Sequence, residues 1–305
     1  MRKQLLAALS ALCVLSVLLT GCGDEDRVKY SGPDYILFAD SLSTVPVQDN
    51  DEYEDIPVVA TQACDYDRTL AVEVLAKESN AIEGKHYELL SNTVTIKAGE
   101  RVANVKVRGI YKNIEVTDSL GFVLKLVTDD KTNWDIYGTT NKVQLLKVCP
   151  FDIHTFTGYA VLTSTYINSY MTTITNRLVK TEIDPDDADG KTIILKAPFY
   201  RGYNLKMRFT TDDILNPLIE ADDQPFASTE EAFGTIYGDG EINMYQPTLY
   251  TSYYSSCEKF VYQYMTLYVP GMAQGTNVVG TFINVFEWVS DDEAARLLRE
   301  GISYN

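Results

Sequence analysis

The sequence has few of the residue types on which catalysis and cofactor binding usually depend. It contains two histidines and five cysteines in 305 residues, with no Cys-x-x-Cys pair and no glycine-rich phosphate or dinucleotide loop. His86 and His154 belong to no recognisable triad or metal cluster, and we expect His154, in the segment between the two domains, to be structural. We therefore expect no enzymatic activity and no cofactor. Carboxylates are numerous, so two of them facing each other across a cleft would restore the enzyme hypothesis.

Positive charge is also scarce. Lys and Arg number 26 against 43 Asp and Glu, which gives a formal net charge of −17. Such a field repels phosphate backbones, so nucleic acid is excluded as a partner.

After the first 19 residues there is no further apolar run of membrane-spanning length, so we expect no transmembrane helix in the mature chain.

The first 22 residues have the three parts of an export signal. Arg2 and Lys3 precede an apolar segment, Leu5 to Leu19, which is too short for a stable membrane span. The following Leu-Thr-Gly-Cys22 resembles the bacterial lipobox. The resemblance implies removal of residues 1–21 as a signal peptide and attachment of lipid to Cys22, which would anchor the protein to a membrane. The alternative is a plain secretory signal followed by an accidental cysteine.

The residues after Cys22 predict where the protein is displayed. Asp24, Glu25 and Asp26 resemble the short acidic run of Bacteroides-type surface lipoproteins. The resemblance implies an outer-membrane protein that faces the cell exterior, although a solvated linker has the same composition. Residues 22–33 form the expected tether, which spans roughly 35 Å when fully extended.

Three cysteines remain beyond the anchor: Cys64, Cys149 and Cys257. Three thiols cannot all pair, so the chain is not a disulfide framework. One bridge is possible, but the simpler interpretation is three buried, small apolar side chains.

Residues 34–149 predict an immunoglobulin-like sandwich of antiparallel strands. Between Val102 and Arg108, apolar and polar residues alternate, as in a strand with one buried face. Seven such segments in this length fit a sandwich. They are 35–38, 56–61, 69–75, 93–96, 102–108, 120–127 and 143–148.

Part of this region resembles a known sandwich family. Ala81 to Tyr87, Val94 to Glu100 and Val105 to Val107 look like a Calx-β repeat, with its Gly-x-Asp-Tyr motif, strand, Gly-Glu turn and second strand. The resemblance implies a fold more than a function. Some members bind calcium through acidic loops, but His86 stands where the motif usually has aspartate.

Two acidic loops could be taken for calcium sites. Asp51, Glu52, Glu54 and Asp55 could line one loop, but we expect a solvated acidic loop there. The segment 184–190 superficially resembles an EF-hand loop but has Ala188 where an acid is expected. We interpret it as a strand connection with an Asp-Gly turn, and we predict no metal site.

Residues 150–305 predict a second β domain, a sandwich or an open barrel, that closes with a short helix. Ser290 to Glu293 is a capping box in front of an amphipathic helix. The overall pattern resembles C-terminal domains of uncharacterised function in Bacteroides-type lipoproteins. The expected strands are 159–167, 173–182, 192–196, 203–209, 233–237, 260–269 and 278–289.

One predicted strand, Phe260 to Val269, carries an aromatic row. Its odd positions are mainly aliphatic and suit a core, whereas its even positions include Tyr262, Tyr264 and Tyr268. With Tyr254 just upstream, these tyrosines are candidate ligand contacts, because a tyrosine ring stacks on sugar and its hydroxyl donates hydrogen bonds. The alternative is that this face also packs, under the C-terminal helix or inside a barrel.

These observations favour a non-enzymatic surface lipoprotein that binds glycan or serves as an accessory module of an outer-membrane system. The alternative is a structural or adhesin-like subunit that binds a protein partner through its sheet edges.

Overall fold

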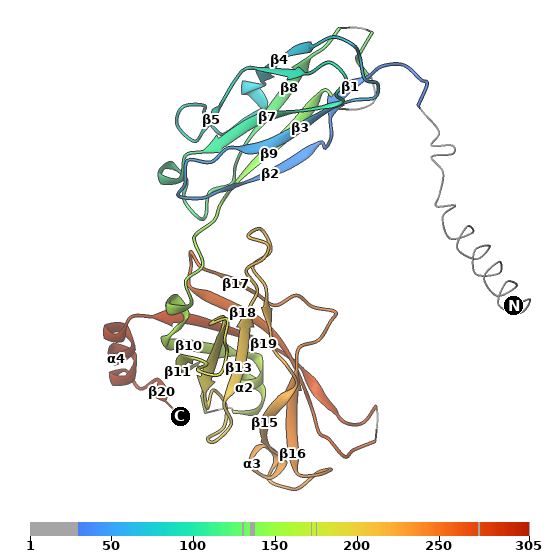
Figure 1. The fold of residues 1–305 in the computed structure, drawn as a ribbon. Helices are drawn as coiled ribbons and strands as arrows, with labels where there is room; N and C mark the ends of the chain where they lie inside the picture. Colours follow the sequence, from blue (N-terminus) through green and yellow to red (C-terminus); the bar gives the residue numbers. More distant parts are fainter. Residues whose placement is uncertain are drawn as a thin grey trace, which may run out of the picture.

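The computed structural model describes residues 30–129, 131–134, 138–171, 173–174, 176–273 and 275–304. Two β domains follow one another along the chain and meet at a narrow junction (Figure 1). The predicted signal peptide and Cys22 lie outside the described residues, so the lipid anchor stays a prediction. Within the described part of the chain, no helix has the length and apolar character needed to cross a membrane.

The first domain is a sandwich of two sheets. The first sheet has the order β1 (Ile36–Phe38), β3 (Glu54–Ala60), β7 (Val102–Gly109), β5 (Tyr87–Leu89). The second has the order β2 (Leu42–Val47), β9 (Thr140–Lys147), β8 (Leu120–Val127), β4 (Arg68–Val74), β6 (Thr93–Ile96). Pairing is antiparallel except between β2 and β9. The short 3-10 helices η1 (Ala76–Glu78) and η2 (Tyr111–Asn113) lie in the connections.

Alternation along the strands builds the core of the sandwich. Val105 and Val107 of β7 are buried, as the sequence pattern predicts, and Tyr87 stacks on Phe122 with ring centroids 3.7 Å apart. Strands β2 and β5 were not expected. Pro46 lies in β2, an edge strand, where its missing N–H leaves no gap in the sheet.

The second domain is one sheet of eleven strands that curves into a barrel. Its main path is β14-β13-β12-β11-β10-β19-β18-β16-β15, while β17 pairs with β18 and β20 with β11. The bounds are β10 (Gly158–Ser164), β11 (Asn176–Ile183), β12 (Thr192–Lys196), β13 (Leu205–Phe209), β14 (Ile219–Glu220), β15 (Gln224–Ser228), β16 (Glu241–Tyr245), β17 (Tyr253–Ser255), β18 (Phe260–Tyr268), β19 (Val278–Val289) and β20 (Ser303–Tyr304).

The edge of the sheet at β14 meets β17, so the sheet closes on itself. Leu218 forms a β-bridge with Tyr253, and the backbone N–H of Ile219 donates to the carbonyl oxygen of Ser252 at 3.2 Å. The backbone N–H of Tyr254 donates to the carbonyl oxygen of Pro217 at 2.9 Å. These contacts turn the sheet around a core of apolar and aromatic side chains. The prediction of an all-β chain with two β domains is confirmed.

Short helices interrupt two segments that were predicted as strands. Strand β10 ends at Ser164, whose hydroxyl caps helix α2 (Thr165–Tyr170) by accepting from the backbone N–H of Tyr166. The predicted strand 233–237 is wrong, because helix α3 (Thr229–Phe233) ends there at Gly234, which has φ 75°. The 3-10 helix η3 (Ile153–Phe156) opens the domain.

The predicted C-terminal helix is confirmed. Helix α4 (Asp291–Arg299) begins after Ser290, whose hydroxyl accepts from the backbone N–H of Glu293 at 3.2 Å. Ala294 of this helix is buried, so the helix packs on the outside of the barrel with its apolar side.

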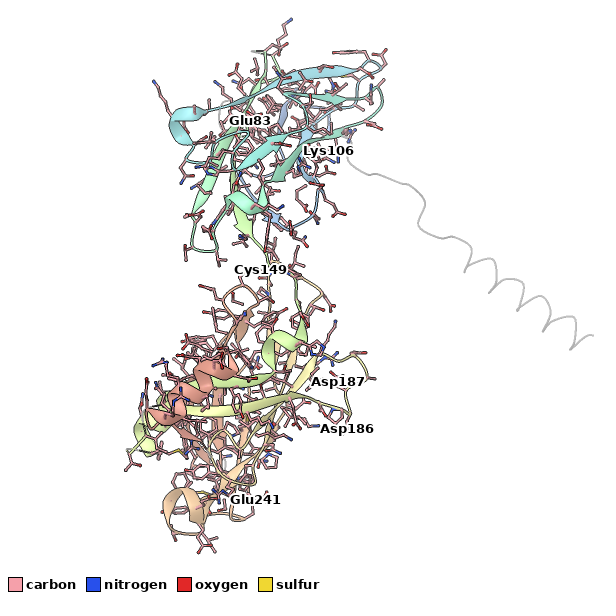
Figure 2. All side chains as sticks on the ribbon, turned by 90° about the vertical axis from the view of Figure 1, so that its left-hand side faces the viewer. Glu83, Lys106, Cys149, Asp186, Asp187 and Glu241 are labelled. Atoms are coloured by element: carbon pink, nitrogen blue, oxygen red, sulfur yellow. A yellow bond between two sulfur atoms is a disulfide. The ribbon has the colours of Figure 1, made fainter. Side chains whose placement is uncertain are left out.

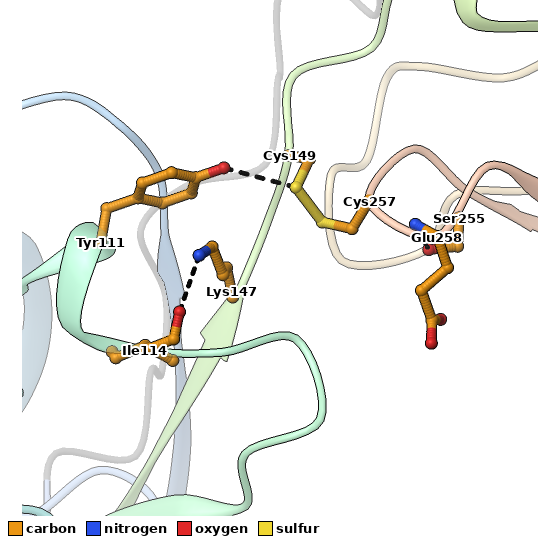
Figure 3. Close-up of a disulfide and its surroundings, with 7 residues drawn as sticks. All are labelled: Tyr111, Ile114, Lys147, Cys149, Ser255, Cys257 and Glu258. Atoms are coloured by element: carbon orange, nitrogen blue, oxygen red, sulfur yellow. Dashed lines mark hydrogen bonds between the residues drawn. A yellow bond between two sulfur atoms is a disulfide. The ribbon is translucent and has the colours of Figure 1, made fainter. Parts of the chain in front are cut away.

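A disulfide joins the interdomain linker to the barrel. Cys149, which Figure 2 places in the narrow segment between the domains, is bonded to Cys257 in the turn between β17 and β18. The hydroxyl of Tyr111 from the sandwich lies 3.3 Å from Cys149 Sγ (Figure 3). The interpretation of all three cysteines as unpaired side chains is therefore wrong for these two, because folding brings positions 108 residues apart together. Cys64 is a free thiol.

Candidate binding site

The alternation of β18 sends its aromatic side chains to the outside of the barrel. Val261, Gln263, Met265 and Leu267 are buried in the interior, while the aromatic side chains at 260, 262, 264 and 268 are only partly buried. A strand with one apolar aliphatic face and one aromatic face is fixed in this orientation, because a shift by one residue would exchange the faces. The outer face of β18 therefore presents the predicted row of rings to the surface.

Two tyrosines from the segment that leads into β17 stack on this row. Tyr253 of β17 is the register partner of Tyr262, and their rings are nearly parallel, with centroids 5.4 Å apart and an interplanar angle of 16°. Tyr250 stacks on Tyr264 at 4.7 Å and 18°. We call these two pairs the tyrosine stacks. The partners from outside β18 are the more exposed ones, at 40% for Tyr253 and 50% for Tyr250.

Hydrogen bonds between side chains and backbone hold the segment that carries both partners. The hydroxyl of Ser252 accepts from the backbone N–H of Tyr264 at 2.9 Å, which ties the segment carrying Tyr250 to β18. Gln246, at the other end of this segment, donates through Nε2 to the carbonyl oxygen of Ile219 at 3.0 Å. Between these anchors Leu249 is 88% exposed. The rings therefore stand on a braced surface that also contains an exposed apolar residue.

Tyr268 lies apart from the stacks, at the far end of β18. Its hydroxyl donates to Asp223 Oδ2 at 2.6 Å, and Asn243 Nδ2 approaches the same hydroxyl at 3.5 Å. The hydrogen bond to the Asp223 carboxylate, together with burial, raises the pKa of Tyr268. Its ring meets Tyr245 edge-on at 5.8 Å. This end of the row is a polar cluster beside an aromatic pair.

Tyr254 does not belong to the surface, which corrects its place among the candidates. It is 5% exposed and packs edge-on against Phe156 and Phe209, with its hydroxyl donating to the carbonyl oxygen of Thr210 at 3.1 Å. Burial raises its pKa. The reason is the period of two along β17, which sends Tyr253 outward and the next residue inward.

A cleft of about 540 Å³ lies beside the disulfide, between the two domains. Val116 and Leu146 of the sandwich and Ile214 and Leu215 of the barrel line it, and all four are exposed. Asp213 also lines it, but Asn216 Nδ2 and the backbone N–H of Leu215 occupy its two oxygens at 2.6 and 2.9 Å. Those bonds lower the pKa of Asp213, so this carboxylate is engaged in shaping the loop.

The two acidic loops are engaged in ion pairs. Asp51 pairs with Arg108 at 2.9 Å, and Asp55 with Lys106 at 2.6 Å, which ties the first loop to β7. In the second loop, Asp184 and Asp187 pair with Lys206 and Arg208 of β13. Among the residues that the structure describes, no group of three or more His, Cys, Asp or Glu is placed to hold a metal ion.

The two histidines have structural surroundings. His86 is buried, and its Nδ1 accepts from the backbone N–H of Ile82 at 3.0 Å, inside the turn that precedes Tyr87. It serves as the turn acceptor at the position where the Calx-β motif has aspartate. His154 is exposed in η3, where its backbone N–H donates to Asp152 Oδ1 at 2.9 Å.

Sequence reasoning placed Tyr262 and Tyr264 on the outer face but missed the part played by Tyr250 and Tyr253. In β17, successive side chains point to opposite faces, so this alternation could have indicated that Tyr253 lies outside. A strand of three residues gives only a weak signal of this kind. Tyr250 lies in a loop without periodicity, and only the fold brings it onto Tyr264.

The barrel matches a known family. Residues 136–300 correspond to the family described as a domain of unknown function, DUF4984, a stretch that runs from just before β9 to the end of α4. No curated protein matches the chain.

Solved structures of distant proteins resemble the chain. A protein of unknown function from Bacteroides ovatus is 12% identical, with 87% of this chain and 92% of that one covered and a TM-score of 0.33. An auxiliary nutrient binding protein from Bacteroides thetaiotaomicron VPI-5482 is 14% identical, with coverages of 87% and 94% and a TM-score of 0.31. The apo form of the Calx CBD1 domain is 13% identical, with coverages of 38% and 98% and a TM-score of 0.31.

Proposed function

The chain belongs to the DUF4984 family, and from that premise we propose that it is a non-enzymatic glycan-binding lipoprotein of the outer cell surface. The observation that carries the proposal is the pair of tyrosine stacks on the outside of β18. Four rings gather on one braced face, and two of them are 40% and 50% exposed. Aromatic rings that do not pack into a core are suited to the apolar faces of sugars, and their hydroxyls to sugar hydroxyls.

The proposed location rests on the sequence. Lipid on Cys22 would hold the protein at the membrane, and the acidic residues after it favour display outside. Along the chain the sandwich separates the tether from the barrel, and it would act as a spacer that carries the tyrosine stacks away from the bilayer. Replacing Cys22 with Ala should move the protein from the membrane fraction to the soluble fraction. Retention in the membrane would contradict the anchor.

The binding role is tested with the chain from Gly23 onward, which keeps every described residue. Affinity electrophoresis against soluble polysaccharides should show retardation by at least one of them. Tyr262→Ala and Tyr264→Ala should each abolish most of that retardation. Tyr66→Ala is the matched control, because Tyr66 is 61% exposed but lies in the sandwich.

Two outcomes would remove the glycan proposal: retardation by none of the polysaccharides, or retardation that survives both tyrosine variants. Co-purification of an outer-membrane protein that depends on Tyr250 or Leu249 would instead favour the protein-interaction alternative. Circular dichroism of each variant must match that of the unmodified protein, so that a loss of binding reports the surface and not the fold.

A further inference from the structure

The two tyrosine stacks are inclined to each other, and their inclination selects among glycans. We infer that the site takes a neutral glycan whose backbone turns from one sugar to the next, as in a helical glucan. This inference rests on the glycan-binding function proposed above. It goes further by naming the shape and the charge of the ligand.

The inclination follows from three ring angles. The rings of Tyr262 and Tyr264 lie 5.4 Å apart at an interplanar angle of 65°. Each carries its stacking partner nearly parallel, within 16° for Tyr253 and 18° for Tyr250. Subtracting both small angles from 65° still leaves roughly 30° between the two exposed partners, so the stacks form two separate platforms that face different directions.

Each platform keeps part of a ring face open. The centroids of Tyr253 and Tyr262 are 5.4 Å apart, more than the contact distance of about 3.7 Å between parallel rings, so the rings are displaced sideways by about 4 Å. The offset between Tyr250 and Tyr264 is about 3 Å by the same reasoning. Displaced rings cover only part of one another, and a sugar can lie on the remainder.

A flat glycan cannot use both platforms. In a ribbon such as β-1,4-glucan, successive sugar rings keep nearly parallel mean planes. Two such sugars cannot both lie flat on platforms inclined to each other by at least roughly 30°. In a backbone that turns, neighbouring sugars present their faces in different directions. The 5.4 Å between the ring centroids of Tyr262 and Tyr264 is close to the length of one sugar residue and therefore suits adjacent sugars.

The surrounding charge excludes an acidic glycan. Strands β17 and β18 carry no charged side chain. Glu287 is the β19 residue opposite Phe260 at one end of the row, and the carboxylate of Asp223 lies beside Tyr268 at the other. Lys259, in the turn before β18, follows Glu258 directly. With a net charge of −17 for the chain, carboxylate or sulfate groups would be repelled at this face.

The experiment compares three classes of polysaccharide by affinity electrophoresis, using the chain from Gly23 onward. The turning neutral class is amylopectin, laminarin and dextran; the flat neutral class is hydroxyethylcellulose and glucomannan; the anionic class is polygalacturonate and chondroitin sulfate. We expect the strongest retardation from a member of the first class. Strongest retardation by a flat or anionic polymer would overturn this inference and leave glycan binding intact, whereas no retardation by any polymer would remove both.

Calorimetry with a pentasaccharide of the retarding polymer then tests whether both platforms act together. Tyr250→Ala removes one exposed partner and Tyr253→Ala the other, and each should weaken binding at least fivefold. Tyr66→Ala should leave the affinity unchanged. If either Tyr250→Ala or Tyr253→Ala left the affinity unchanged, a single platform would suffice, and the inference from the inclination of the stacks would be wrong.

Discussion

Removing the Cys149–Cys257 disulfide should destabilise the barrel and leave the sandwich unchanged. The bond closes a segment of 108 residues that contains β10 to β17, and the sandwich lies outside this segment. A cross-link restricts the unfolded chain, and the restriction grows with the logarithm of the loop length. For this loop the chain-entropy relation gives about 4–5 kcal/mol. That is a large part of the stability of a domain of this size.

Each domain contains one tryptophan, so the two unfolding reactions can be followed separately. Trp134 stacks on Tyr35 in the sandwich, with ring centroids 5.5 Å apart. Trp288 is 8% exposed in the barrel, where its indole N–H donates to Thr181 Oγ1 at 2.9 Å. A Trp134→Phe background therefore reports the barrel alone, and a Trp288→Phe background the sandwich.

The assay is urea unfolding followed by tryptophan fluorescence. The double variant Cys149→Ser/Cys257→Ser avoids a leftover thiol. With a denaturant slope of about 2 kcal/mol per M, a loss of 4–5 kcal/mol lowers the barrel midpoint by about 2 M. The midpoint of the sandwich should not move. Cys64→Ser is the control, because Cys64 is a free thiol and its replacement leaves the loop closed.

Two results would refute this reasoning. A barrel midpoint that shifts by less than about 0.5 M would mean that the linker is already held by other contacts, so that the cross-link restricts little. An equal shift in both domains would mean that they unfold as one unit, which the narrow junction argues against (Figure 1).

Two further predictions concern buried tyrosines. Burial raises the pKa of Tyr87 from 10.0 to about 12, so the folded sandwich keeps the phenol proton to a higher pH than the unfolded chain does. The contribution of this group to the stability of the sandwich should be fully present below pH 10. It should fall by up to about 2–3 kcal/mol between pH 10 and 12. In Tyr87→Phe, the free energy of unfolding measured with urea should depend less on pH between 10 and 12. An unchanged pH dependence in this range would show that Tyr87 does not cause the loss. In the barrel, the hydroxyls of Tyr166 and Tyr200 share a buried hydrogen bond of 2.8 Å, so Tyr166→Phe should destabilise the barrel by about 1–3 kcal/mol. Adding Tyr200→Phe should recover part of that loss in thermal unfolding, and a purely additive double variant would show that the pair is not coupled.

Local pattern determined much of the secondary structure. The alternation in β18 places Tyr262 and Tyr264 outside and Val261 and Met265 inside, and Ser290 marks the start of α4. These features depend on residues a few positions apart, so the sequence contains the whole signal. Short strands such as β14 and β17 were missed because two or three residues show no periodicity.

The segment 233–237 shows how a local signal can mislead. Its aromatic and β-branched residues favour a strand, yet helix α3, which Ser228 caps by accepting from the backbone N–H of Glu231 at 3.1 Å, extends to Phe233, and residues 234–237 form no strand. Gly234 then ends the helix in a left-handed conformation. The left-handed turn at Gly234 interrupts the extended backbone that a strand through this segment needs, whatever the strand preference of its side chains.

An acidic, all-β chain with an aromatic strand could be predicted from the residues alone, while the export signal in its first 22 residues stays a prediction. Only the tertiary structure decided that Cys149 pairs with Cys257, that Tyr250 reaches Tyr264 from a loop, and that Tyr254 lies in the core. The difference lies in how far apart along the chain the interacting residues stand. Strand alternation and helix caps are fixed within one turn or one strand, whereas a disulfide, a ring stack from a loop and the closure of a barrel depend on chain segments that meet only after folding.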